Sequence, residues 1–150
     1  MKAMKKIILL LAILGMCQGG VTDVFAQDEQ DTLQYTLRIS VKDLETNGGR
    51  IMIAVFNSPD SFLMKPFKVM AIPADNISSN PASLNLPRGV YAVSLFQDAN
   101  NNGILDTGAY GIPTEKYGFS NDAEAIMGPP VFEKCSFQFK GDTNITISLR

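Results

Sequence analysis

The stretch LPRGVYAVSLFQDANNNGILD, residues 86–106, decides how the chain is organised. It opens with a tight-turn signal, Pro-Arg-Gly at 87–89, in which proline takes the second turn position and glycine closes the turn. Val90–Gln97 follows and is apolar on both faces, which is typical of a strand that is covered on both sides. From Asp98 to Pro130 the chain then shows no clean strand or helix pattern and is rich in Asn, Gly and Asp. Loops of this length in a compact domain are commonly functional, so we look for a site there first.

Apolar residues elsewhere in the chain recur with the period of strands. Tyr35–Lys42 alternates apolar and polar side chains, and Arg50–Phe56 is apolar on both faces. Shorter or weaker strands are predicted at 67–72 and 84–86, and alternating strands at 131–140 and 145–149. With Val90–Gln97 this makes about seven strands and no long helix, which predicts an all-β, antiparallel two-sheet sandwich with one long loop.

The connections between these strands carry their own turn signals. The Asn-Gly-Gly run at 47–49 tolerates positive φ and predicts a hairpin between the first two strands. Ser58 followed by Pro59 predicts a capped helical turn that carries Phe62 and Leu63 inward. Residues 74–80 are expected to form a polar excursion, and 141–142 a turn.

The cysteine in the 131–140 strand needs a separate interpretation. Cys135 is expected to share a face with Phe137 and Phe139, opposite three polar side chains. This favours a buried core thiol over a reactive one.

The first 26 residues have the pattern of an export signal. Lysines at 2, 5 and 6 precede an apolar run, Ile7–Cys17, that is too short to span a bilayer, and Val-Phe-Ala at 24–26 is typical of a cleavage site. We therefore expect a periplasmic or secreted protein with a flexible lead-in at 27–34 and a single domain at 35–150. Lipid attachment at Cys17 is a minor alternative, because Met16 stands where such motifs have a small residue, and a membrane anchor is another.

Composition narrows the classes of function. Residues 1–26 hold three of the 13 basic and one of the 15 acidic residues, so 10 basic and 14 acidic residues remain after processing. No basic run is left, which makes nucleic acid and anionic membranes poor partners. Only Cys135 remains, so no intramolecular disulfide can form.

The absence of histidine limits the catalytic options. It removes Ser-His and Cys-His dyads and the usual zinc sites. The remaining catalytic alternative is a carboxylate pair, Asp98 or Asp106 with Glu115, acting as acid and base on a glycoside.

The long loop also has the spacing of calcium-binding loops. Asp98, Asn100, Asn102 and Asp106 stand at positions one, three, five and nine, and glycine at position six permits the sharp turn. The backbone carbonyl of Ile104, at position seven, would face the ion as well. These five residues are the candidate metal ligands.

This pattern is not an EF-hand, and it has an alternative interpretation. Ala109 stands at position twelve, where an EF-hand has a bidentate glutamate, so Glu115 or Asp122 would have to fold back to supply that carboxylate. The neutral asparagines lower the ligand charge and predict a Kd of roughly 10⁻⁴–10⁻³ M. Alternatively, the Asp and Asn side chains satisfy the loop's own backbone through Asx-turns and need no ion.

Three aromatic residues, Tyr110, Tyr117 and Phe119, lie among the glycines of the same loop. If exposed, they could stack on a glycan or anchor a protein partner, and with Glu115 they are the candidate interaction residues. The alternative is a small satellite core beneath the loop.

Four motifs together resemble a known family. They are Leu-Pro-x-Gly-x-Tyr-Ala at 86–92, Asp-x-Asn-x-Asn-Gly-x-x-Asp at 98–106, Gly-Ile-Pro-x-Glu-x-Tyr-Gly-Phe-Ser-Asn at 111–121 and Gly-Pro-Pro-x-Phe at 128–132. As a set they resemble the domain-of-unknown-function 2141 family of small exported bacterial proteins, from about Leu37 to Leu149. The resemblance implies a transthyretin-like or immunoglobulin-like sandwich, similar also to carboxypeptidase-regulatory domains, and it implies no activity. Cys135 departs from the small residue expected at its position.

The sequence thus predicts a non-catalytic envelope protein whose 98–130 loop is a binding surface for a protein or glycan, with calcium as a candidate ordering ion. A purely structural envelope component without a ligand is the first alternative. A carboxylate-based glycan-processing enzyme is the second.

Overall fold

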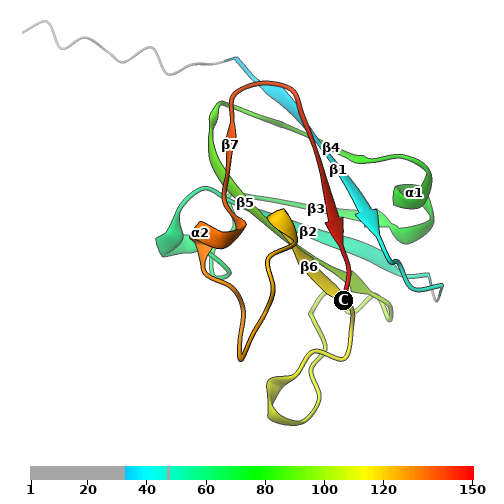
Figure 1. Ribbon diagram of the computed structural model, residues 1–150. Helices are drawn as coiled ribbons and strands as arrows, with labels where there is room; N and C mark the ends of the chain where they lie inside the picture. The colour runs from blue at the N-terminus through cyan, green and yellow to red at the C-terminus, as the bar shows by residue number, and fades with distance from the viewer. Residues whose placement is uncertain (1–32, 47) are drawn as a thin grey trace, which may run out of the picture.

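A computed structural model describes residues 33–46 and 48–150, so the expected export signal, Cys17 and most of the lead-in lie outside the described residues. The described residues form eight strands in two sheets (Figure 1). The first sheet has the order β4-β1-β8, with β1 at Tyr35–Lys42, β4 at Ala82–Leu86 and β8 at Thr143–Ser148. The second has the order β3-β2-β5-β6, with β2 at Arg50–Phe56, β3 at Lys68–Pro73, β5 at Gly89–Asp98 and β6 at Tyr117–Phe119; β7, at Phe137–Phe139, pairs with the start of β5.

The helical elements of the described residues are short. They are α1 (Ala74–Ser79), α2 (Phe132–Cys135) and the 3-10 turns η1 (Pro59–Ser61), η2 (Ala109–Gly111) and η3 (Ser120–Asp122). None of them is long or apolar enough to cross a membrane. The predicted all-β sandwich is therefore confirmed, with one pair, β1 and β8, running parallel.

The main core lies between the two sheets, because alternate side chains of each strand point inward. Leu37 and Ile39 of β1 meet Ile51 and Ile53 of β2 there, together with Leu95 of β5, and all of them are buried. Removing apolar surface from water stabilises a fold by about 25 cal/mol per Å², so burial of this layer stabilises the contact between the two sheets.

A second cluster covers the outer face of the second sheet. It contains Phe56 of β2, Ala92 of β5, Phe119 of β6 and two residues of α2, Phe132 and Cys135. This cluster explains why β2 and β5 are apolar on both faces, as the sequence indicated.

The connection at 47–49 does not form the expected hairpin. Gly48 and Gly49 have φ values of 77° and 76°, so the positive φ is as predicted. However, β1 and β2 belong to different sheets, so the turn carries the chain from one sheet to the other.

The turn at Ser58 is largely as predicted. Ser58 Oγ accepts a hydrogen bond of 3.2 Å from the N–H of Asp60, and Pro59 is the first residue of η1. Phe62 packs edge-to-face against Phe56 with ring centroids 5.2 Å apart. The expectation that Leu63 points inward is wrong, because a φ of 59° turns the chain there and leaves the side chain exposed.

Two further segments differ from the sequence prediction. Residues 74–79 form α1 rather than a polar excursion, because Ala74 and Ile77, three positions apart, enter the main core from one helix face. Residues 131–140 form α2 and then β7 rather than one strand. Cys135 is buried beside Phe132, while Phe139 enters the other cluster, so these residues do not share a face.

Candidate functional site

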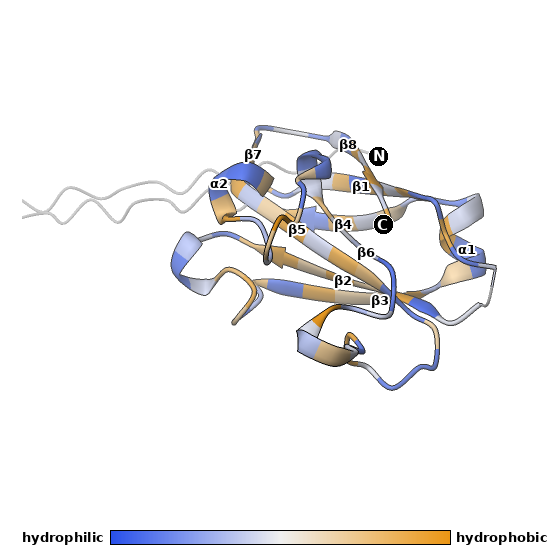
Figure 2. Cartoon of the chain, turned by 60° about the horizontal axis from the view of Figure 1, so that its bottom comes forward, coloured by the Kyte–Doolittle hydropathy of each residue, from blue (hydrophilic) through white to orange (hydrophobic). Residues whose placement is uncertain are grey.

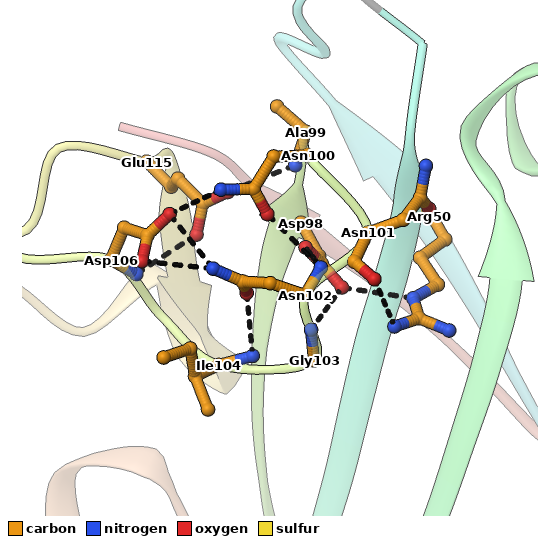
Figure 3. Close-up of polar contacts among 10 residues, drawn as sticks. All are labelled: Arg50, Asp98, Ala99, Asn100, Asn101, Asn102, Gly103, Ile104, Asp106 and Glu115. Carbon is orange, nitrogen blue, oxygen red and sulfur yellow. Dashed lines mark hydrogen bonds and ion pairs between the residues drawn. The ribbon is translucent and has the colours of Figure 1, made fainter.

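The carboxylate of Asp98, at the end of β5, organises the start of the long loop (Figure 3). Its Oδ1 accepts a hydrogen bond from the N–H of Asn102 at 3.0 Å, and its Oδ2 accepts from the N–H of Gly103 at 2.9 Å. Arg50 Nε donates to the same Oδ2 at 2.9 Å, and the guanidinium also donates to the carbonyl of Asn101 at 3.1 Å. Asp98 is 0% exposed, so a buried carboxylate links the sheet to the loop through hydrogen bonds.

The protonation state of Asp98 follows from these contacts. Burial alone would raise its pKa, because it removes the charged form from water. The hydrogen bond from Arg50, the N–H groups of Gly103 and Asn102, and the arginine charge together outweigh burial and hold the pKa of Asp98 below its usual value. Asp98 is therefore a charged hydrogen-bond acceptor at neutral pH and is poorly suited to donate a proton.

The two asparagines of the motif form Asx-turns. Asn100 Oδ1 accepts from the N–H of Asn102 at 3.0 Å, and Asn102 Oδ1 accepts from the N–H of Ile104 at 3.0 Å. Their amide nitrogens donate to the carboxylate of Asp106, at 2.6 Å from Asn100 and at 3.0 and 3.1 Å from Asn102. The spacing predicted from the sequence thus does bring these side chains together.

Glu115 closes the loop from its far end. Its Oε1 accepts from the N–H of Ala99 at 2.9 Å, and its Oε2 accepts from the N–H of Asp106 at 3.0 Å. Of the two carboxylates considered for folding back, Glu115 reaches the loop, whereas Asp122 accepts from the N–H of Ser148 instead. Residues 98–116 therefore form one hydrogen-bonded unit, which we call the Asp98 loop.

The donor set at this loop can be compared with what a cation needs. Among residues 33–46 and 48–150, no three His, Cys, Asp or Glu side chains are grouped so as to hold a metal ion. A calcium ion would depend on the amide oxygens of Asn100 and Asn102, each of which has a second lone pair, and on Asp106. It would also meet the Arg50 guanidinium at Asp98, and this positive charge opposes cation binding.

The three candidate aromatics are separated by the structure. Tyr110 lies in η2 with a φ of 62° and is 100% exposed. Phe119 is only 7% exposed, and Tyr117 is half-buried with its ring centroid 5.9 Å from that of Phe119. Tyr117 and Phe119 thus belong to the second cluster, as the satellite-core alternative proposed, and Tyr110 alone is free to meet a partner.

Sequence reasoning did not single out several other exposed apolar residues on the loops. Ile104 and Ile112 belong to the Asp98 loop, and Ile126 and Met127 belong to residues 123–131, which we call the Met127 loop; all four are strongly exposed. Both loops extend toward the lower edge of the molecule in Figure 1. A shallow hollow of about 240 Å³, lined in part by Ile126, lies beside β6. These residues could have been found from the sequence, because large apolar residues stand there among the glycines and prolines of a loop.

A buried polar residue, Gln97, was also missed. Its Nε2 donates to the carbonyls of Glu45 and Gly48 at 3.0 and 2.9 Å, and its Oε1 accepts from the N–H of Glu45 at 2.8 Å. Gln97 therefore holds the segment that connects β1 to β2, and it does so next to the start of the Asp98 loop.

The chain was compared with known proteins. A family model described as "Uncharacterized protein conserved in bacteria (DUF2141)" matches residues 39–148, which include both loops and both sheets apart from the first four residues of β1. No curated protein matches the chain. No solved structure matches it either.

Proposed function

Since the chain belongs to the DUF2141 family of bacterial proteins, whose description names no activity, we propose its function from its own surface. The protein is an exported, non-catalytic binding module of the bacterial envelope, and it engages a protein or glycan partner through the tips of the Asp98 and Met127 loops. Export is supported by the basic and apolar pattern of residues 1–26.

One observation carries this proposal: a fully exposed aromatic side chain, Tyr110, stands on a loop that is held at both ends by partly buried hydrogen bonds. Asp98 and Glu115 fix both ends of the loop through backbone N–H groups. A tip held in this way loses little conformational entropy on binding, which favours affinity. Tyrosine is also among the residues that dominate binding energy at interfaces.

The non-catalytic part of the proposal rests on the state of the carboxylates. Asp98 accepts three hydrogen bonds in a buried position, and Glu115 accepts two backbone N–H bonds. A general acid needs a free proton and a general base a free lone pair aimed at the substrate. The third carboxylate of the glycosidase alternative, Asp106, accepts hydrogen bonds from the amides of Asn100 and Asn102, so all three carboxylates of that alternative bond within the loop.

Calcium remains a second candidate for the Asp98 loop. The observation that favours it is the convergence of Asn100, Asn102 and Asp106 on one another. Bound calcium would replace amide–carboxylate hydrogen bonds by coordination and would leave the binding role of the tip unchanged.

Site-specific photo-crosslinking tests the binding role. A photo-reactive amino acid is placed at Tyr110, at Met127 or, as the control, at Asn144, an exposed position on β8. In the producing bacterium we expect covalent adducts of defined mass from the two tip positions and none from the control. Equal labelling at all three positions, or no adduct at either tip, would refute the proposal. The mass of the isolated protein's N-terminus tests export independently.

A further inference from the structure

We propose that two copies of this chain pair through the open edge of β3, forming one sheet that continues across both copies. β3 is the terminal strand of the β3-β2-β5-β6 sheet, and no other strand of the described residues pairs with its outer side. Figure 2 shows β3 beside β2 at the margin of the sheet. β3 belongs to neither the Asp98 loop nor the Met127 loop.

The hydrogen-bond pattern shows which backbone groups of β3 face outward. Ala74 N–H donates to the carbonyl of Gly49 at 3.1 Å, in the same register that pairs Arg50 with Pro73. Because antiparallel strands bond on alternate residues, the even-numbered residues of β3 bond to β2 and the odd-numbered residues face the open side. Val69 and Ala71 thus present N–H and C=O groups outward. Pro73 is also odd-numbered and faces the open side. This position suits proline, because proline has no N–H that would be left unpaired there.

The features that usually protect exposed strands are confined to the two ends of this edge, at Lys68 and Pro73. Natural edges are blunted by charges, prolines or bulges along the strand. Here the residues between Lys68 and Pro73 are all apolar, and Val69 is 65% exposed on the outer face. Met64 and Phe67, just before the strand, are exposed as well. An apolar edge with free backbone groups is a template for another strand.

The β3 edge of one copy is complementary to the β3 edge of a second copy, so we infer that the binding partner is another copy of this chain. In a two-fold antiparallel arrangement, Val69 of each copy pairs with Ala71 of the other, so both outward N–H groups are used and Pro73 lies beyond the pairing. The side chains also fall on matching faces of the sheet. Directly opposed residues of antiparallel strands point to the same face, and Val69 and Ala71, which oppose each other, both point to the outer face.

Charges at the two ends of the strand support this arrangement. An antiparallel pair brings the start of β3, preceded by Lys65, to the end of β3 in the second copy, followed by Asp75 of α1. Both side chains are exposed, and neither forms an ion pair with another described residue. The two-fold axis therefore creates two opposite-charge contacts that one copy alone does not make.

Sedimentation velocity tests this on protein isolated from cells that express the full chain. Because a short strand pairing buries little surface, we expect a weak, reversible dimer that is populated at several hundred micromolar protein. Ala71→Pro removes an outward N–H without removing a bond to β2, and we expect it to remain monomeric with an unchanged circular dichroism spectrum. A wild-type protein that stays monomeric at several hundred micromolar would overturn the proposal, as would a dimer insensitive to Ala71→Pro.

A charge-reversal pair tests the register without depending on proline. Lys65→Glu places two like-charge contacts in the dimer and is expected to weaken it at least about threefold. Adding Asp75→Lys to the same chain is expected to restore the wild-type Kd to within about twofold. Lys140→Glu, a charge reversal at an exposed position that follows β7, is the matched control and should leave the Kd unchanged. Weakening without rescue would refute this register.

Discussion

Arg50 Nε lies 2.9 Å from Asp98 Oδ2, and this contact joins the first residue of β2 to the last residue of β5. The same two residues are opposed in the register of the two strands. Asp98 in turn accepts the N–H groups of Asn102 and Gly103, so one carboxylate links the sheet edge to the loop. The loop geometry therefore depends on an ion pair that is part of the sheet.

Replacing Asp98 should destabilise the whole fold. Asp98→Asn keeps the shape of the side chain, but its amide cannot accept from all three donors, so at least one of the N–H groups of Arg50, Asn102 and Gly103 loses its partner. Because Arg50 is partly exposed, we expect a loss of about 2–3 kcal/mol in the free energy of unfolding, below the range for a fully buried pair. Urea denaturation measures it. Asp60→Asn, at an exposed position outside the proposed dimer contacts, is the control and should change stability by under about 0.5 kcal/mol.

The Asp98 carboxylate also makes the free energy of unfolding depend on pH in the acidic range. The folded-state pKa of Asp98 is lowered, so its contribution is fully present above the unfolded-state pKa of about 3.9 and is lost as the pH falls below that value toward the folded pKa. We expect the stability difference between wild type and Asp98→Asn to be constant from pH 5 to 7 and to shrink below about pH 4. Urea titrations at each pH measure this, and a constant difference down to pH 2.5 would contradict the assignment.

The local part of this arrangement could be predicted from the sequence, but the long-range part could not. The one-three-five-nine spacing brings Asp98, Asn100, Asn102 and Asp106 together, and both Asx-turns are visible in that spacing. Arg50 lies 48 positions earlier, and no local pattern shows which cation will face Asp98. A turn motif depends on neighbouring residues, whereas a sheet register depends on the whole fold.

The same distinction explains the errors in the fold prediction. The strands with several alternating residues, such as β1 and β5, were found because a period of two is unambiguous over that length. Phe132 and Cys135 lie three apart, which fits one turn of helix, but the alternation after Cys135 extended the strand prediction over them. β6 has only three residues and no flanking pattern, so pairing with β5 alone identifies it.

Gly49 should be far less replaceable than its neighbour Gly48. Both have positive φ, so alanine would be strained at either position by about 1–2 kcal/mol. At Gly49 an added Cβ would also overlap the carbonyl oxygen of Asp98 and lie 2.7 Å from Ala99 Cα, whereas at Gly48 it would meet open space. We expect Gly49→Ala to cost at least about 3 kcal/mol and Gly48→Ala about half as much or less. Similar losses in thermal unfolding would show that the backbone moves to admit the methyl group.

The Cys135 thiol should be unreactive in the folded protein. It is fully buried, and burial raises its pKa to about 11, so thiolate is scarce at neutral pH. We expect an aromatic disulfide reagent to label it at least about 100-fold more slowly in the native protein than in urea. The double variant Cys135→Ser, Asn144→Cys, which carries an exposed thiol, provides the reference rate. Equal native rates for the two proteins would mean that α2 opens readily.

Calcium binding is best tested with Asp106 rather than Asp98. Loss of Asp98 would destabilise the fold whether or not an ion binds, since Arg50 and two backbone groups depend on it. Asp106 contacts the amides of Asn100 and Asn102 near the surface, so Asp106→Asn changes the ion's donors with a smaller effect on the core. If calcium binds with a Kd near 10⁻³ M, about 5 mM calcium should raise the unfolding free energy by about 1 kcal/mol relative to excess chelator, and Asp106→Asn should lose that increase. Magnesium at the same concentration is the control for ionic strength. An unchanged midpoint in wild type would leave the Asx-turns, Glu115 and Arg50 as the groups that order the loop.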